Sequence, residues 1–402
     1  MKNLLALLLG LVLTMTLLIV SFDFPLFEPM PTIAPPVPVD TQPGTAAPTD
    51  PTSTDPEPTI PSAPATIPTT ETTPIVYDLP MSAIALTEHK EFTKDKDGSV
   101  YFTYIYPNVR LYLTNEAISE TVTLDLLNRI DATRIQANAV RDDAANSGAG
   151  SGFYQVQYTP QRIDGAILSL FGTMTSFSGG SHPGSSCIGI TYDLLSGNAL
   201  SLDDILTDQC TAEVLCRLVV DALASINQDH LLYDDYAISV EERFSGNYLT
   251  DEGWYLSREG LCFSFEPYEI GPYSSGIITA VIPYTQLPGY LEDACFPMEQ
   301  ISAQGSLIAE PLSDTNLDPY AHPATLNLDP NADALVIRTD GLIYDIMIQT
   351  TYPDTTVLFA ADQMTPGRPI IVRGSADHLQ IVYRNGSEIV SIPLLALLKI
   401  PG

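Results

Sequence analysis

Basic residues are scarce in this sequence. It holds 17 Lys and Arg against 49 Asp and Glu, a formal net charge of −32 over 402 residues. Such an acidic surface repels phosphate groups, so we exclude nucleic acid as a partner. The charge either serves only to keep the protein soluble or favours cationic partners and divalent ions.

The sequence also lacks the patterns that bind structural zinc. It has no CxxC and no Cys/His cluster with metal-ligand spacing, so we expect no metal or other cofactor. An odd number of cysteines in an exported chain allows at most two disulfides, and the pairing stays open. Two of them, Cys210 and Cys216, cannot bridge within one regular helix, because six residues rise about 9 Å. The five cysteines are Cys187, Cys210, Cys216, Cys262 and Cys295.

Charge is absent from a long stretch near the amino terminus. The 19 residues from Leu4 to Phe22 are uncharged, and as a helix they would span about 28 Å, close to the hydrocarbon thickness of a bilayer. The stretch is either a cleaved signal peptide or an uncleaved anchor. No small-x-small cleavage site follows directly, so we predict a transmembrane signal anchor at residues 1–23. With Lys2 in the cytoplasm, the rest of the chain would lie outside the cell.

Residues 24–74 lack what a folded core needs. Pro25 to Pro74 hold 15 of the 33 prolines and no Lys or Arg, and no aromatic residue lies between Phe27 and Tyr77. Such a segment cannot bury enough apolar surface to fold, and its prolines favour an extended chain. We predict a disordered Pro/Thr-rich stalk, about 150 Å long when extended, that would raise the globular part through a thick Gram-positive cell wall.

The globular part begins with a predicted α+β domain at residues 75–177. Residues 99–113 indicate a strand, an interruption at Pro107 and a second strand. Alternating residues predict further strands at 153–158 and 166–177. Ser119 to Ala145 predict one helix that packs on this antiparallel sheet. Its apolar face is formed by Val122, Leu126, Ile130 and, less regularly, Ile135.

A second α+β domain is predicted at residues 178–304. It has a small-residue loop at 178–186, a strand at 187–193 and an amphipathic helix at 212–226. Residues 254–284 then indicate a hairpin strand, a corner rich in proline and tyrosine, and another strand. The corner FEPYEIGPYSSG allows only one backbone path, which suggests that something docks there.

The last segment, residues 305–402, indicates five to seven short strands. Turns are expected at Thr339-Asp340-Gly341 and at Arg384-Asn385-Gly386, where Asn-Gly is a hairpin signal. We predict a small all-β module of the sandwich or barrel type. The predicted fold class is therefore α+β, with two helix-on-antiparallel-sheet domains followed by this module, behind the membrane anchor and the stalk.

The candidate ligand-binding residues come from the small-residue loop and the corner. The tyrosines are either docking aromatics or packing groups of the corner. The serines beside His182 suggest a nucleophile and base, but no orienting acid or oxyanion hole is marked, and the loop is explained equally by a tight turn. Glu266 and Glu269 match no glycosidase pattern. The candidates are Ser181, His182, Tyr268, Glu269 and Tyr273.

Several aspartates offer an alternative, a calcium site. Calcium needs six to eight oxygen ligands, and no DxDxDG spacing is present. Asp203 and Asp204 are more simply explained as acidic residues at the start of a helix. The aspartates in question are Asp193, Asp203, Asp204, Asp234 and Asp235.

Several segments carry a resemblance to a known family. FTYIYPNVRLYLTNEAISETVTLDLLNRID, the GGSHP loop, ITYDLLSGNALSLDDIL and LTDEGWYLSREGLCFSFEPYEIGPYSSGIITAVIPYTQL together resemble a pair of bacterial extracytoplasmic domains of unknown function, over about residues 75–303. Such a pair forms the ectodomain of the lysozyme-sensing anti-sigma-V factor and the non-catalytic part of a peptidoglycan deacetylase. The resemblance implies binding of a strongly cationic protein, for which an acidic ectodomain is suited.

From these observations we expect a single-pass protein of the cell membrane with its ectodomain outside the cell. It would recognise a wall polymer such as peptidoglycan or a cationic protein such as lysozyme. No catalysis is expected, because nothing after Gln304 supplies the Asp and His set of the deacetylase. The alternatives are a hydrolase or deacetylase that modifies the cell wall, or an envelope scaffold subunit.

Overall fold

The computed structural model describes residues 80–147, 150–226, 231–297, 305–313, 315–318, 321–385 and 388–398. All of them belong to one compact unit, residues 72–402. The predicted anchor at 1–23 and the stalk at 24–74 lie outside the described residues. Within the described ranges, no helix has the length and apolar character that a membrane crossing requires.

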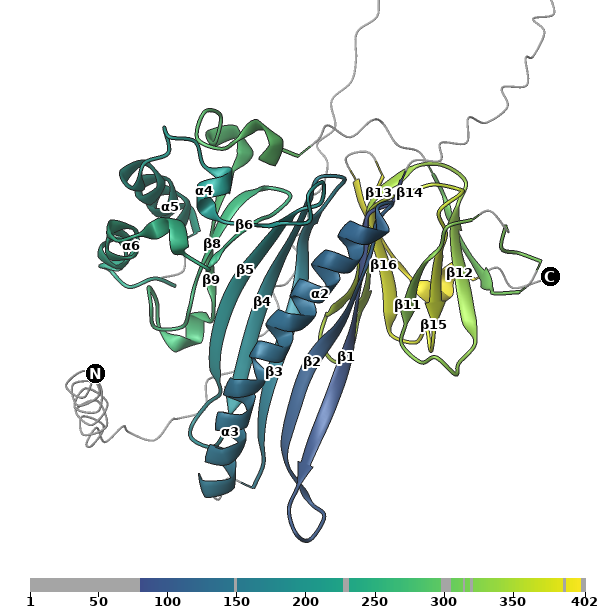
Figure 1. The fold of residues 1–402 in the computed structure, drawn as a ribbon, viewed down its shortest axis with the longest axis horizontal. Helices are drawn as coiled ribbons and strands as arrows, with labels where there is room; N and C mark the ends of the chain where they lie inside the picture. The colour runs from purple at the N-terminus through teal and green to yellow at the C-terminus, as the bar shows by residue number, and fades with distance from the viewer. Residues whose placement is uncertain are drawn as a thin grey trace, which may run out of the picture. The chain divides into compact units, whose positions relative to one another are not determined.

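A ten-stranded sheet organises this unit, in the order β17-β16-β13-β14-β1-β2-β3-β4-β5-β6 (Figure 1). Neighbouring strands are antiparallel, except that β2 and β3 run parallel. The fold is mixed α/β, with large sheets and few helices. The strands are β1 Ala83–Lys94, β2 Val100–Tyr112, β3 Gly152–Ile163, β4 Ile167–Phe177, β5 Gly184–Asp193, β6 Ala199–Leu200, β13 Ile343–Thr350, β14 Val357–Met364, β16 Leu379–Asn385 and β17 Glu388–Pro393.

The predicted interruption at Pro107 is absent, because β2 is one continuous strand. It pairs with β1 along its whole length, whereas β3 pairs with it only from Phe102 to Ile105. Pro107 therefore lies beyond the segment where β2 has strands on both sides, and a proline without an N–H group is tolerated there.

The single helix predicted at 119–145 is two helices, α2 Glu116–Ala132 and α3 Arg134–Ser147. They meet at Thr133, whose hydroxyl donates to the Ile130 carbonyl at 2.7 Å and lies 2.9 Å from Tyr104 Oη. These contacts fix the end of α2 on the sheet.

The predicted buried face is confirmed in α2 and wrong in α3. Val122, Leu126 and Ile130 are buried against the sheet. Ile135 is 75% exposed. The break at Thr133 ends the regular spacing, and the buried residues of α3 are instead Ala137 and Ala144.

Residues after 305 form eight strands in the described part of the chain, but these strands are not a self-contained module. Half of them join the ten-stranded sheet, where β14 pairs with β1 at Ala83–Ala85. The others form a four-stranded sheet, β10-β12-β15-β11, that packs against β13, β14 and β16 as one side of a β-sandwich. They are β10 Leu307–Pro311, β11 Ala324–Asn327, β12 Ala334–Thr339 and β15 Ile370–Arg373.

Strand β1 explains why the predicted domain at 75–177 and the predicted module at 305–402 share one sheet instead of forming two separate units. Ala83 and Ala85 belong to the core under the four-stranded sheet, whereas Ile84 and Leu86 belong to the core under α2 and α3. Successive residues of a strand point to opposite faces, so one strand contributes to two cores. The first predicted domain and the last segment therefore share a sheet.

The third core lies in residues 202–295. Helix α5 spans Ala212–Ile226, as predicted, and packs with α4 Leu202–Ile205 and α6 Tyr236–Ser245, of which α6 was not predicted. They cover an antiparallel sheet of β7 Trp254–Leu256, β8 Gly260–Phe265 and β9 Ile278–Pro283. Short 3-10 turns complete the fold: η2 Tyr248–Thr250, η3 Tyr273–Ser275, η4 Tyr284–Gln286, η5 Asp293–Cys295 and η6 Leu394–Leu397.

A glycine in β5 lets this third part approach the main sheet closely. Gly189 N–H donates to the Glu252 carbonyl at 2.7 Å, and a Cβ at Gly189 would clash with the carbonyl oxygen of Trp254. Only glycine allows the backbone of β7 to lie this near β5. The contact sets the position of the corner that follows β8.

Candidate functional site

The structure brings together aromatic residues from the two segments that the sequence singled out. The His182 ring, in the loop before β5, stacks on the Tyr273 ring of the corner, with centroids 3.9 Å apart and planes at 29°. The Tyr268 ring lies 5.8 Å from Tyr273 and 6.4 Å from His182. We call His182, Tyr268 and Tyr273 the aromatic cluster.

Hydrogen bonds hold the aromatic cluster in place. Tyr273 Oη donates to the Pro183 carbonyl at 2.9 Å, and His182 Nδ1 lies 3.1 Å from the same oxygen. Tyr268 Oη lies 3.4 Å from His182 Nε2. Loop and corner are thereby joined through side chains 86 residues apart in the sequence.

Tyr268 is presented to solvent by an uncommon backbone conformation. Its φ is 74°, in the left-handed region that residues other than glycine seldom adopt, and its side chain is 57% exposed. Its N–H donates to the Gly271 carbonyl at 3.0 Å, which closes the turn. The fold therefore keeps a costly conformation at a position where a large aromatic ring faces water, a combination that suggests function.

Glu269, a predicted ligand-binding residue, has its carboxylate bonded within the corner. It accepts from the Glu266 N–H at 2.9 Å and from Arg243 Nη1 at 3.2 Å. Burial raises the pKa of Glu269, although Arg243 opposes this. Glu266 in turn accepts from the Cys187 N–H of β5 at 3.1 Å. The structure gives both glutamates a positioning role, because they brace the corner that carries Tyr268.

Arg243 of α6 anchors the corner through its bond to Glu269, and the sequence analysis did not identify it. It donates to both oxygens of Asp251, at 2.5 and 2.8 Å, and to the Ser264 carbonyl at 2.9 Å. Its guanidinium also lies 4.5 Å from the centre of the Phe265 ring. The sequence did hold one indication of its importance: residues 203–285 contain only three arginines and no lysine, so each basic residue there stands out.

The geometry around His182 does not form a nucleophile and base. Within the described residues, no hydrogen bond joins His182 to Ser181, Ser185 or Ser186; its two ring nitrogens lie near Pro183 O and Tyr268 Oη instead. Ser181 and His182 are exposed. The rings of His182 and Tyr268 face solvent, and the Tyr268 hydroxyl and His182 Nε2 are the polar groups between them.

Two of the aspartates considered for calcium serve a turn and a helix start. Asp193 accepts from the Leu195 N–H and the Ser196 hydroxyl, and Asp204 forms a capping box with Ser201 at the start of α4. Across the part of the chain that the structure covers, no group of three or more His, Cys, Asp or Glu is arranged to hold a metal ion.

All five cysteines are free thiols. Burial raises the pKa of Cys187 to about 12 and that of Cys210, Cys262 and Cys295 to about 11. Thiols with raised pKa values are poor nucleophiles, and Cys210, Cys262 and Cys295 act as small apolar groups of the core.

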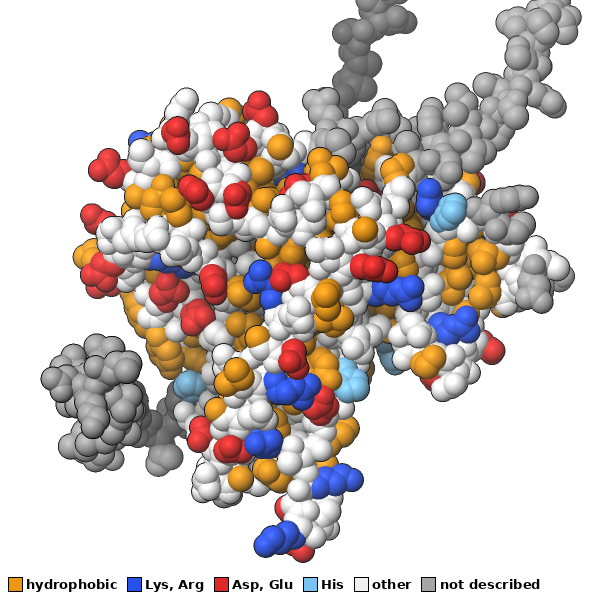
Figure 2. Space-filling model, in the orientation of Figure 1, with side chains coloured by type: hydrophobic (Ala, Val, Ile, Leu, Met, Phe, Trp, Pro, Cys, Tyr) orange, Lys and Arg blue, Asp and Glu red, His pale blue; other side chains and the backbone are white. Residues whose placement is uncertain are grey.

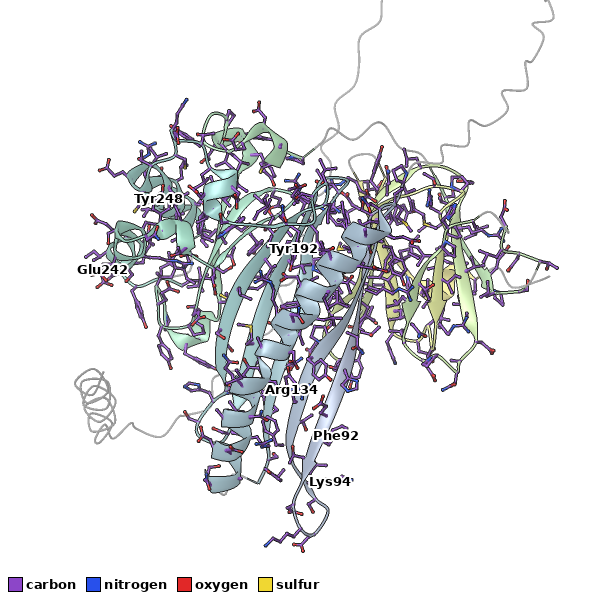
Figure 3. The ribbon with its side chains drawn as sticks, in the orientation of Figure 1. Phe92, Lys94, Arg134, Tyr192, Glu242 and Tyr248 are labelled. Carbon is purple, nitrogen blue, oxygen red and sulfur yellow. The ribbon has the colours of Figure 1, made fainter. Side chains whose placement is uncertain are left out.

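The segment that carries Tyr268 and Tyr273 is rich in acidic residues, and some of them lie on the helices α5 and α6. Residues 203–285 contain 15 Asp and Glu against three Arg. Figure 2 shows acidic side chains gathered over the part that holds α5 and α6, and Glu242 of α6 points outward (Figure 3). This surface is suited to attract cations.

Comparison with protein families assigns the region that carries the corner. Residues 203–285 match the family described as "Protein of unknown function (DUF3298)". The chain contains a DUF3298 domain. The DUF3298 domain includes Tyr268, Tyr273 and Arg243, whereas His182 lies before it. The predicted resemblance to a domain of unknown function is thus confirmed for residues 203–285. The predicted resemblance to the anti-sigma-V factor and to the deacetylase stays a prediction.

Two solved structures with DUF3298 domains are similar over about half of this chain. A DUF3298 family member from Bacteroides fragilis NCTC 9343 is 16% identical, with 52% of this chain and 94% of that chain covered and a TM-score of 0.38. A DUF3298 family protein from Pseudomonas aeruginosa PAO1 is 18% identical, with 54% and 97% covered and a TM-score of 0.36. No curated protein matches the sequence.

Proposed function

We propose that this protein is a membrane-anchored extracellular recognition protein of the bacterial envelope, and that its aromatic cluster binds a cationic protein such as lysozyme. One observation carries the proposal: the His182, Tyr268 and Tyr273 rings converge from two distant segments on a braced, solvent-facing corner. Rigid aromatic side chains of this kind are favoured at interface hot spots.

The charge of the domain favours a cationic partner. Fifteen acidic residues against three arginines would speed the encounter with a basic protein. Lys and Arg side chains also bind the faces of aromatic rings, so a basic partner could place a cation on Tyr268. The predicted resemblance to the lysozyme-sensing ectodomain supports the same partner.

A wall polymer such as peptidoglycan is the second candidate ligand. The supporting observation is again Tyr268, whose 57% exposed ring offers an apolar face on which a sugar ring can pack. The location outside the cell rests on the predicted anchor at 1–23 and the stalk at 24–74.

The test is binding of residues 72–402 to lysozyme and to purified peptidoglycan. The dissociation constant for lysozyme should rise steeply with salt, since the complex would depend on charge. Tyr268→Ala should weaken binding by about tenfold or more, the range of a hot-spot residue. Tyr352→Ala is the matched control, because Tyr352 is 69% exposed and also packs beside a histidine, His378.

The outcomes separate the alternatives. Binding to peptidoglycan alone, lost in Tyr268→Ala, would make the wall polymer the ligand. Binding to neither would refute the recognition function. An envelope scaffold subunit, or a hydrolase or deacetylase that modifies the cell wall, would then be the hypothesis to pursue.

A further inference from the structure

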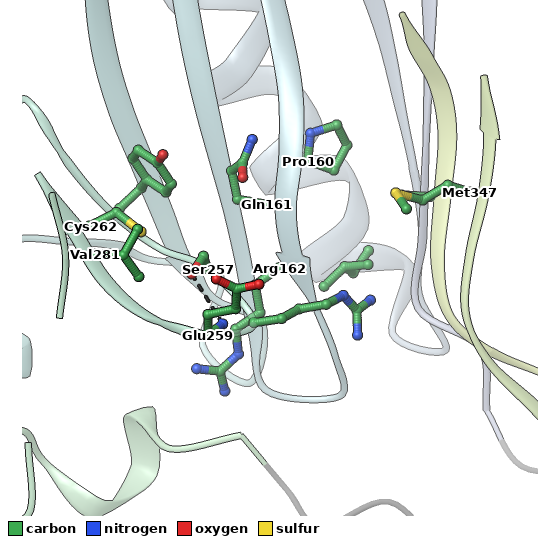
Figure 4. A pocket seen from close by; sticks show the side chains of 12 residues that line it. Pro160, Gln161, Arg162, Ser257, Glu259, Cys262, Val281 and Met347 are labelled. Carbon is green, nitrogen blue, oxygen red and sulfur yellow. Dashed lines mark hydrogen bonds between the residues drawn. The ribbon is translucent and has the colours of Figure 1, made fainter. Parts of the chain in front are cut away.

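A cavity of about 320 Å³ lies where three parts of the chain meet (Figure 4). The end of β3, the β7–β8 hairpin with β9, and the strands β13 and β14 each contribute residues to its wall. The volume is at the lower end of the range for small-molecule sites. The cavity is distinct from the aromatic cluster, since none of His182, Tyr268 and Tyr273 lines it.

Of the two arginines in its wall, Arg162 is committed to the fold. Its side chain is 2% exposed, and it donates to Asp164 at 2.7 Å, to Tyr284 Oη at 2.8 Å and to the carbonyls of Cys295 and Phe296 at 2.5 and 3.3 Å. Four of its five N–H donors are used in these bonds and its side chain is buried, so the fold rather than a ligand takes up Arg162.

Arg258, in the turn between β7 and β8, is only half engaged. Its Nη1 donates to the Asp345 carboxylate, and its Nε and Nη2 donate to no residue in the described ranges. The Nε–Nη2 edge is one that binds a carboxylate through two parallel hydrogen bonds. The side chain is 29% exposed, so a ligand can reach this edge.

The positive charge of Arg258 is only partly compensated by the acidic groups around it. Asp345 is shared, because it also accepts from Arg384 Nε at 2.9 Å. Burial, together with the like charges of Arg384 and Arg162, lowers the pKa of Arg258 to about 10. Of the other acids nearby, Asp164 is paired with Arg162, burial raises the pKa of Asp362 to about 7, and Glu259 is exposed in the cavity wall. An anion on the Nε–Nη2 edge would compensate the charge of Arg258, whereas the carboxylate of Glu259 opposes it.

The rest of the wall is mainly apolar, and its other polar side chains are those of Gln161, Ser257 and Glu259. We propose that the cavity binds a small amphipathic carboxylate, with its head group on the Nε–Nη2 edge of Arg258 and its hydrocarbon part against the apolar wall. A neutral ligand of the same shape would leave the Arg258 edge unpaired, and a bare anion would leave the apolar wall uncovered. The apolar wall residues are Pro160, Ile163, Tyr255, Val281, Met347 and Ala360.

The test is calorimetric titration of the full-length chain with hexanoate, with hexanol as the neutral probe of similar shape. We expect saturable binding of hexanoate, no detectable binding of hexanol, and at least tenfold weaker binding of hexanoate in Arg258→Gln. Arg141→Gln is the matched control, because Arg141 lies on α3, away from the cavity wall, and should leave the affinity unchanged.

A second variant keeps the charge and fills the space. Met347→Trp should abolish hexanoate binding while Arg258 stays in place, and this variant decides the question if Arg258→Gln does not fold. Failure of the natural chain to bind hexanoate, or equal affinity in the natural chain and in both folded variants, would overturn the proposal.

Discussion

The ring of His182 stacks on the ring of Tyr273, with centroids 3.9 Å apart, and this contact joins the loop before β5 to the corner before β9. The two segments are separate in sequence, and their contact joins the exposed rings of His182 and Tyr268 to the partly buried ring of Tyr273.

The Tyr273 hydroxyl should matter for stability and less for binding. Tyr273→Phe removes the 2.9 Å hydrogen bond to the Pro183 carbonyl and keeps the ring. We expect a loss of about 1 kcal/mol in the free energy of unfolding, the usual net value of one hydrogen bond. Urea unfolding measures the loss, and lysozyme titration should show a smaller effect than Tyr273→Ala. Equal binding defects in the two variants would contradict a role for the ring.

Gly189 should tolerate no side chain. In Gly189→Ala the new Cβ would meet the Trp254 carbonyl oxygen, so β5 and β7 must separate. We expect a loss of roughly 2 kcal/mol or more in the free energy of unfolding, as for other overpacked core sites. Gly246→Ala is the control, since no atom lies within 4 Å of its added Cβ. Equal unfolding midpoints in urea for the two variants would contradict the close approach.

Arg243 should be hard to replace. Arg243→Met removes the partner of Asp251 and leaves that carboxylate in a site where its side chain is only 10% exposed. We expect a loss of roughly 3 kcal/mol in the free energy of unfolding, since breaking a buried ion pair leaves one charge uncompensated. Chemical unfolding measures it, with Arg141→Met as the control, because the Arg141 side chain is 34% exposed and its partner Asp142 is 66% exposed. A loss no larger than in that control would show that Asp251 is stabilised by other groups.

Asp362 should make the protein less stable as pH rises toward neutrality. Burial raises the pKa of Asp362 from 3.8 to about 7, so the folded state holds a proton that the unfolded state releases. This contribution is fully present below pH 4 and is lost as pH rises to about 7. Asp362→Asn should remove the loss, and at pH 8 the variant should be more stable than the natural chain by roughly 2 to 4 kcal/mol.

Thermal unfolding between pH 4 and pH 8 measures this difference. Asp354→Asn is the control, because Asp354 is exposed in the β13–β14 connection. A parallel pH dependence in the natural chain and in Asp362→Asn would show that Asp362 does not hold the proton.

Glu91 should act in the opposite direction. Hydrogen bonds from Arg134 and Tyr106 lower the pKa of Glu91 from 4.5 to about 2. The resulting stability is present above pH 4.5 and is lost as pH falls to about 2. Both partners of the Arg134 ion pair are about 40% exposed, so solvent screening limits the effect to about 1 kcal/mol. Glu91→Gln should be less stable at pH 7 and equal to the natural chain near pH 2, as measured by urea unfolding.

Part of the fold could be predicted because its signals are local. The apolar spacing of residues 212–226 identifies α5 with the observed bounds, and the alternation around Trp254 and Phe263 identifies the β7–β8 hairpin. Helix and strand periodicities depend on residues a few positions apart, which the sequence displays directly. Thr133 ended a helix that periodicity alone would continue, because its hydroxyl bonds Tyr104 of a distant strand.

The candidate site divides in the same way. Turn chemistry in the GGSHP loop and in FEPYEIGPYSSG was enough to single out His182, Tyr268 and Tyr273 as residues of interest. The stacking of these rings was not predictable, because it depends on the close approach of β5 and β7 at Gly189. The bond of Glu269 to Arg243 was not predictable either, because it depends on the packing of α6 against the corner.

The sequence by itself determined the acidic charge, the scarcity of cations in the DUF3298 domain and the positions of α5 and the β7–β8 hairpin, since these are properties of composition and of neighbours along the chain. Only the tertiary structure decided that β1 pairs with β14, that the rings form one surface, and that Arg258 meets Asp345 beside a cavity. Each of these contacts joins residues far apart in sequence. Their partners are selected by the packing of whole sheets, and no local pattern records that selection.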